Sequence, residues 1–245
     1  MRTRLLASPS LEDVIVLLRA WRFWLAGALL GGLLGGAYYL AFPPPFRAAA
    51  TVVVDFNLEK TWPDSPDSQL FYYLDRESRK LSEVAWSDAT LAQVAQKTGF
   101  SVIELRTGKL DLSQPQDGGW HFYGVDPHAD IAGKVATAWA EAFTAQVRQG
   151  IQTAVDLDAT RKALALKPGD AGLQATTTAL EAKSQAITPE LQISLAQDKD
   201  LPAVRKTGIG SYTLAGAAIC LALACLWILF FGGRPQTDRR QPSRP

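Results

Sequence analysis

Two long apolar blocks lie near the two ends of the chain. The first runs from Phe23 to Phe42 and the second from Ser211 to Phe231, and neither contains a charged residue. At 1.5 Å per residue, each block is long enough as a helix to cross the roughly 30 Å hydrocarbon core of a bilayer. Aromatic side chains stand at the ends of both blocks, where they favour the level of the lipid headgroups. The pattern predicts transmembrane helices at residues 23–42 and 211–231.

A cleaved signal peptide is the alternative for the first block. Basic residues precede it, and Ala48 to Ala50 offer small residues for cleavage. The uncharged run is longer than the roughly 7 to 15 residues of a signal-peptide core. We therefore favour a retained helix, preceded by a leader over residues 1–22 that lies along the inner membrane face.

Basic residues flank both blocks on the sides that face the chain ends. They are Arg2, Arg4, Arg19 and Arg22 before the first block, and Arg234, Arg239, Arg240 and Arg244 after the second. The positive-inside rule then places the leader and a basic tail over residues 232–245 in the cytoplasm. Residues 43–210 carry 17 basic and 21 acidic side chains, and two spans leave them outside the cytoplasm. We expect a multi-pass protein of the plasma (inner) membrane.

The segment between the blocks contains several strand patterns. Residues rich in β-branched types predict a strand at Phe46–Phe56, and alternation predicts a hairpin of Lys109–Ser113 and Trp120–Val125. Another strand is predicted at Leu191–Ala196, antiparallel to the first and returning toward the membrane. The expected fold class is α+β, with two transmembrane helices flanking one extracytoplasmic α/β domain over residues 43–210 that carries a long helical arm.

Helical periodicity predicts the remaining elements. One helix places four apolar residues on one face: Leu70, Leu74, Leu81 and Val84. Ser87 and Gly99 bracket the next helix as cap and stop. A long helix opens with Asp126 as its cap and Pro127 in its first turn. The turn at Lys167–Asp170 introduces another helix that could run back antiparallel.

The long helix carries a stripe of apolar residues spaced four apart. They are Ile131, Val135, Trp139, Phe143, Val147, Ile151 and Val155. Because an α-helix has 3.6 residues per turn, this stripe winds around the helix by about 240°, and one flat neighbour cannot cover it. We expect the near half to dock on the sheet and the far half to meet another helix or another subunit. The candidates for the core or an inter-subunit contact are Val135, Trp139, Phe143, Val147 and Ile151.

Glycine is concentrated in the first apolar block. Gly27, Gly31 and Gly35 form one row of small residues four apart, and Gly32 and Gly36 form another. The second block offers its own stripe of small residues: Ser211, Ala215, Ala218, Ala222 and Cys225. Helices in lipid associate where small residues let their backbones approach. We expect these rows to pack the two helices on each other or on neighbouring copies; the alternative is that glycine is simply common in membrane helices.

The inventory of reactive side chains points away from catalysis. The two histidines, His121 and His128, lack metal-ligand spacing, and the two cysteines, Cys220 and Cys225, lie on different faces of the second apolar helix. There is no Gly-rich phosphate-binding loop. A net charge of +1 gives no field that would attract nucleic acid. We expect no catalytic residues, no cofactor, no metal and no nucleic-acid partner.

Aromatic residues gather at the start of the first predicted helix of the middle segment. Phe71, Tyr72 and Tyr73 follow shortly after Trp62. They could stack on the rings of a polysaccharide, or pack into the core. We favour core packing for part of the cluster.

The order of these parts points to a family. It is carried by LEDVIVLLRAWRFWLAG, PPPFRAAATVVV, VIELRTGKLDL and VDPHADIAGKVATAWAEAF, followed by the second apolar block and a short tail. This arrangement resembles the polysaccharide chain-length determinant (Wzz) family, also called polysaccharide co-polymerases. The resemblance is to the short form, since related tyrosine kinases of capsule export carry a kinase domain after the second span.

The resemblance implies a non-enzymatic membrane protein. Such a protein assembles into a homo-oligomeric ring and works with the polymerase or export machinery of a surface polysaccharide to set chain length. That polysaccharide would be an O-antigen of lipopolysaccharide, a capsule or an exopolysaccharide. The alternative is a transmembrane adaptor or activator of a separate tyrosine kinase or of another complex of the cell envelope.

Overall fold

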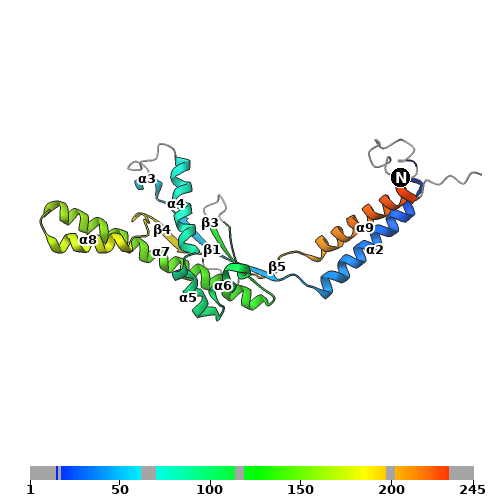
Figure 1. The fold of residues 1–245 in the computed structure, drawn as a ribbon, viewed down its shortest axis with the longest axis horizontal. Helices are drawn as coiled ribbons and strands as arrows, with labels where there is room; N and C mark the ends of the chain where they lie inside the picture. The colour runs from blue at the N-terminus through cyan, green and yellow to red at the C-terminus, as the bar shows by residue number, and fades with distance from the viewer. Residues whose placement is uncertain (1–14, 16–17, 62–69, 114–118, 197–201, 232–245) are drawn as a thin grey trace, which may run out of the picture. The chain divides into compact units, whose positions relative to one another are not determined.

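The computed structural model describes residues 15, 18–61, 70–113, 119–196 and 202–231. The chain divides into two compact units, Met1–Pro44 with Thr207–Pro245, and Pro45–Lys206. We call them the helix-pair unit and the α/β unit and describe each by itself (Figure 1). The basic tail, most of the predicted leader, Trp62 and most of the predicted hairpin turn lie outside the described residues.

The helix-pair unit consists of two apolar helices. They are α2 (Trp21–Ala41) and α9 (Ile209–Phe231), at the places where the sequence predicts membrane helices. Both are long and apolar enough to cross a membrane, and only 6% and 0% of their most apolar stretches are buried in the protein. A core helix of a water-soluble domain would instead be mostly buried. The prolines after Phe42 have no N–H to continue α2, which ends at Ala41.

One antiparallel sheet organises the α/β unit. Its strands are β1 (Phe46–Asp55), β2 (Leu110–Ser113), β3 (Gly119–Asp126), β4 (Gln192–Leu195) and β5 (Val204–Arg205). The strand order is β2-β3-β1-β4, and β5 pairs with the first residues of β1. The predicted first strand, hairpin and returning strand are confirmed, with Val52 opposite both Trp120 and Leu195. The sequence did not predict β5, because two residues are too few to form a pattern.

Seven helical segments complete the described part of the α/β unit. They are α3 (Leu58–Thr61), α4 (Leu70–Ala85), α5 (Asp88–Thr98), α6 (Val102–Glu104), the π-helix η2 (Leu105–Lys109), α7 (Ala129–Leu166) and α8 (Ala171–Lys183). The predicted cap and stop of α5 are confirmed: the Ser87 side chain accepts a hydrogen bond from the Thr90 N–H, and Gly99 is left-handed. Asp170 caps α8 in the same way.

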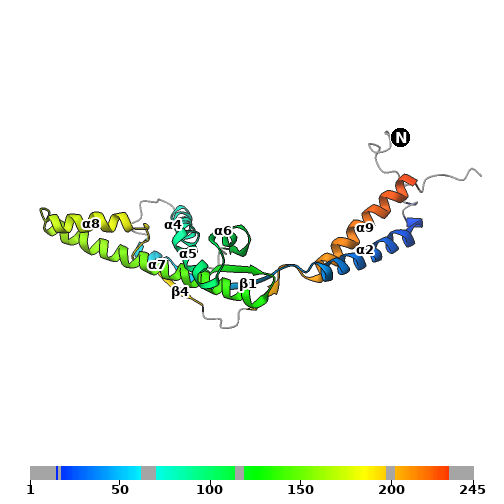
Figure 2. The same cartoon turned by 60° about the horizontal axis from the view of Figure 1, so that its bottom comes forward.

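Helix α7 covers one face of the sheet and forms the centre of the core (Figure 2). Alternate residues of β1 and β3 point toward it, because side chains alternate across a strand. The Phe122 ring lies 4.9 Å from the rings of both Trp139 and Phe143. The Trp139 indole N–H donates to the Ala85 carbonyl at 2.9 Å. This bond ties the end of α4 to α7.

The prediction for the start of α7 is wrong by two residues. The cap is His128, and the helix begins at Ala129. Asp126 instead ends β3, and its carboxylate accepts a hydrogen bond from the His128 N–H at 2.9 Å and one from Lys109. Because Lys109 and the His128 N–H hold this carboxylate, it is not available to the first turn of the helix.

The buried face of α4 also differs from the predicted one. Leu81 and Val84 are buried as expected, but Leu70 is 41% exposed, and Tyr73 and Glu77 lie inside. The buried Glu77 carboxylate pairs with Lys80 at 2.8 Å. A paired carboxylate can occupy an interior position that apolar periodicity does not predict.

The far half of α7 packs against α8, which doubles back beside it (Figures 1 and 2). Arg161 pairs with Glu181 at 2.7 Å across this helical hairpin. Beyond Val147 the buried positions are Gly150, Ala154 and Leu157, while Val155 is 43% exposed. The buried positions therefore follow the 3.6-residue period of an α-helix, and a residue of the stripe spaced four apart, Val155, lies outside the interface.

Candidate functional site

Three glycines of α2 form the contact with α9. A Cβ at Gly31 would lie 2.2 Å from the Gly216 carbonyl oxygen, and one at Gly35 would lie 2.2 Å from the Tyr212 carbonyl oxygen. At Gly27 it would lie 3.1 Å from the Ala224 Cβ. Distances below 3 Å to backbone atoms leave no room for a side chain. The row of small residues therefore sets how closely the two helices approach.

The second glycine row borders this contact. A Cβ at Gly32 would meet its nearest neighbour, the Thr213 carbonyl oxygen, at 3.7 Å, and a Cβ at Gly36 would lie 3.4 Å from the Thr213 side chain. Both are ordinary van der Waals distances. The two rows thus differ: the first requires glycine at Gly31 and Gly35, and the second tolerates alanine.

On α9 the contact with α2 uses a different face from the predicted stripe of small residues. Ala215, Ala218 and Ala222 are exposed, whereas Gly216 and Cys220 lie against Gly31. The reason is that the closest approach needs a backbone without Cβ on both helices, and Gly216 meets this condition where alanine does not. The sequence signal for this contact was Gly216, which the predicted stripe of small residues did not include.

Aromatic rings gather at one end of the helix pair. The Tyr212 ring stacks on Tyr38 with 6.0 Å between centroids and meets Tyr39 edge-on at 5.5 Å. Tyr38 also lies 5.1 Å from Phe42. Tyrosine favours the membrane–water boundary, so these contacts fit a helix end at headgroup level.

The candidate residues of the long helix lie in the core of their own chain. Val135, Trp139, Phe143 and Val147 are fully buried, and Ile151 packs partly buried against the same core. They stabilise the core of the α/β unit.

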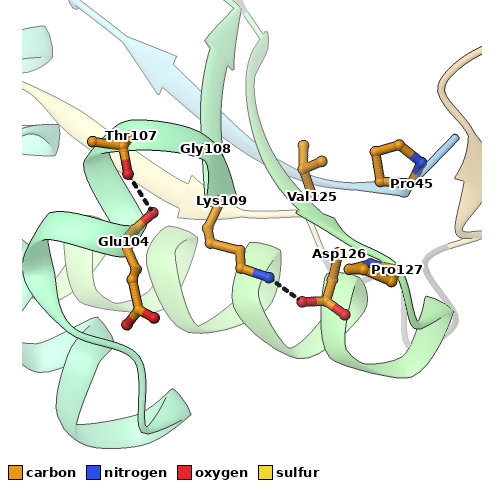
Figure 3. Close-up of a pocket in the computed structure, with 8 residues that line it drawn as sticks. All are labelled: Pro45, Glu104, Thr107, Gly108, Lys109, Val125, Asp126 and Pro127. Atoms are coloured by element: carbon orange, nitrogen blue, oxygen red, sulfur yellow. Dashed lines mark hydrogen bonds and ion pairs between the residues drawn. The ribbon is translucent and has the colours of Figure 1, made fainter.

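A shallow depression of about 280 Å³ lies in the α/β unit between η2 and the β3–α7 turn. Figure 3 shows Lys109 pointing across it to Asp126, with Pro45, Val125 and Pro127 on the Asp126 side. The Asp126 carboxylate is 4% exposed and the Lys109 side chain 24%. The Lys109 ammonium also lies 4.7 Å from the Phe100 ring centroid, within cation–π range.

Two carboxyl groups at this depression are ionised at neutral pH. Burial alone would raise the pKa of Asp126, but hydrogen bonds from Lys109 and His128 outweigh burial and lower it. Hydrogen bonds from the Ser101 backbone N–H and hydroxyl lower the pKa of Glu104. The negative charges of Asp126 and Glu104 therefore outnumber the one positive charge of Lys109.

The histidines and aromatic residues singled out in the sequence lie at different places. His121 Nδ1 lies 3.0 Å from Thr51 Oγ1, and His128 lies beside Asp126. Within the described residues, no group of three His, Cys, Asp or Glu side chains could hold a metal ion. Tyr73 is buried, whereas Phe71 and Tyr72 are 74% and 60% exposed.

Compared with protein-family models and with curated proteins, the chain gives no match.

Proposed function

We propose that this chain is a membrane-anchored, non-enzymatic homo-oligomer that regulates the chain length or export of a surface polysaccharide. Both termini lie in the cytoplasm, and the α/β unit lies outside it. The polymerase or the export machinery of the polysaccharide is its functional partner.

The observation that carries the anchoring part is the helix pair. Two apolar helices from opposite ends of the chain contact each other through glycines, and only 6% and 0% of their most apolar stretches are buried in the protein. A lipid bilayer removes the exposed apolar side chains of both helices from water. The acidic excess between the helices and the arginines beyond them support the orientation.

The polysaccharide part rests on the resemblance to the chain-length determinant family. The strand that follows the prolines, the hairpin and the long helix after Asp-Pro occur here in the order of that family. β4 and β5 both pair antiparallel with β1. The strand that follows α2 in sequence, β1, therefore pairs with the strand that precedes α9, β5. This pairing suits a domain held by two neighbouring membrane helices.

The test is the length distribution of the surface polysaccharide, separated by electrophoresis, in cells that lack the gene. Restoring the natural chain should restore one preferred length. Gly31→Ala should fail to restore it, while Gly32→Ala at a matched level of protein should succeed. An unchanged distribution in the deletion strain would refute the proposal, and a lost phosphorylation of a separate kinase would favour the adaptor alternative.

A further inference from the structure

We propose that the depression between η2 and the β3–α7 turn binds one neutral pyranose ring of the polysaccharide. The inference rests on the proposed function and adds to it a place of contact and a class of ligand.

The size of the depression limits its ligand to about one ring. Its volume of about 280 Å³ lies just below the range of roughly 300 to 1,000 Å³ of small-molecule pockets. It is also open to solvent, which allows a ring inside a longer polymer to enter without a chain end.

Lys109 supplies the hydrogen-bond donors. An ammonium group has three N–H donors, and Asp126 accepts one from it. The Asp126 carboxylate also accepts from the His128 N–H, so it is held in place and in turn fixes the position of Lys109. The remaining N–H donors of Lys109 are available to the oxygens of a hydroxylated ligand.

The walls and the charges select a neutral ring. Pro45, Val125 and Pro127 offer aliphatic surface for the C–H groups of a sugar. Asp126 and Glu104 carry two negative charges against one positive charge, so an anionic sugar or a phosphate is repelled. A neutral pyranose matches both the aliphatic walls and the single donor group.

Gly108 allows a test that leaves the ion pair intact. A Cβ at Gly108 would meet nothing within 4 Å, and its φ lies outside the left-handed region, so a side chain fits without strain. Gly108→Leu should fill the depression. Gly133 of α7 is equally open and does not line the depression, so Gly133→Leu is the matched control. Lys109→Ala is less useful, because it leaves a buried carboxylate unpaired and risks misfolding.

Saturation-transfer NMR on the full chain in lipid nanodiscs measures the binding. The nanodiscs must contain no glycolipid and no sugar-based detergent. The probes are the methyl glycosides of D-glucose, D-galactose and N-acetyl-D-glucosamine, with D-glucuronate and inorganic phosphate as anionic comparisons. We expect transfer to at least one neutral glycoside, loss of that transfer in Gly108→Leu, and its retention in Gly133→Leu.

Three results would overturn the inference: no transfer to any neutral glycoside, equal transfer in Gly108→Leu, or stronger binding of glucuronate or phosphate. Different results would refute the inference and the proposed function. Lost sugar binding with intact control of chain length refutes only the inference, whereas intact binding with an unchanged length distribution in the deletion strain refutes the function.

Discussion

Gly31 and Gly216 meet backbone to backbone in the helix pair. A Cβ on either residue would lie 2.2 Å from the carbonyl oxygen of the other. The close approach of α2 and α9 therefore depends on the absence of a side chain at both positions. The glycines that would destabilise a helix in water, by about 1 kcal/mol each, here make the contact between helices possible.

Gly31→Ala should destabilise the helix pair by about 1 to 3 kcal/mol, the range of overpacked sites. The added Cβ must push α9 away, because it meets the Gly216 backbone and the Cys220 Cβ at 2.6 Å. The two cysteines of the chain, Cys220 and Cys225, report this change directly. Their reaction with a thiol-sensitive dye on heating in detergent should begin at a lower temperature.

Gly32→Ala is the control, since its Cβ finds ordinary van der Waals distances. The variant should react with the dye at the temperature of the natural chain. If Gly31→Ala and Gly32→Ala shift the transition equally, the contact between Gly31 and Gly216 does not determine the packing.

Gly124→Ala should destabilise the α/β unit, by about 1 to 3 kcal/mol or more. Its Cβ would lie 2.2 Å from the Ala132 carbonyl oxygen and 2.7 Å from the Ala136 nitrogen, so β3 must move away from α7. Gly133→Ala on α7 should instead stabilise by up to about 1 kcal/mol, because alanine favours a helix and the position is open. Urea unfolding of the full chain in detergent, followed by tryptophan fluorescence, measures both changes in the free energy of unfolding. The two changes must have opposite signs.

Trp139→Phe should lower the free energy of unfolding by about 2 to 3 kcal/mol. The substitution removes the indole N–H that donates to the Ala85 carbonyl and leaves that buried oxygen without its donor. It also leaves a cavity next to Phe122 and Phe143. The free energy of unfolding in urea, followed by circular dichroism, provides the measurement. A loss below about 0.5 kcal/mol would show that the bond adds little to the core.

Stability should fall with pH below the ordinary carboxyl pKa of 3.8 because of Asp126. The folded state lowers the pKa of this group, so the unfolded state binds the proton at higher pH. The stabilisation is therefore complete above 3.8 and is lost as the pH falls through the lower folded pKa. Asp126→Asn should be less stable at pH 7 and lose less stability on acidification. Parallel unfolding curves of both chains between pH 6 and pH 2.5 would contradict this role.

The sequence predicts the elements whose signals are local. The uncharged runs, the Ser87 and Gly99 boundaries and the hairpin each follow from neighbouring residues alone, and each is present. The face of α9 that contacts α2 was not predicted, because several faces of an alanine-rich helix look equally small. Only the position of Gly31 on the partner helix selects Gly216.

The depression could not be predicted from local patterns. Its lining comes from three separate segments, at residues 45, 104–109 and 125–127, which come together only when β1, β3 and η2 are in place. Asp126 shows the same limit. Its sequence position next to a proline and a helix is typical of a cap, and only the approach of Lys109 gives it another role.

The mass and symmetry of the full chain, extracted in a mild detergent, test the central proposal most directly. A regulator built as a homo-oligomer should give one closed ring of identical copies, visible by electron microscopy and with a single mass in native mass spectrometry. Gly31→Ala should weaken or abolish that ring, whereas Gly32→Ala should retain it. A natural chain that remains a folded monomer at all concentrations in detergent and in nanodiscs would contradict the account.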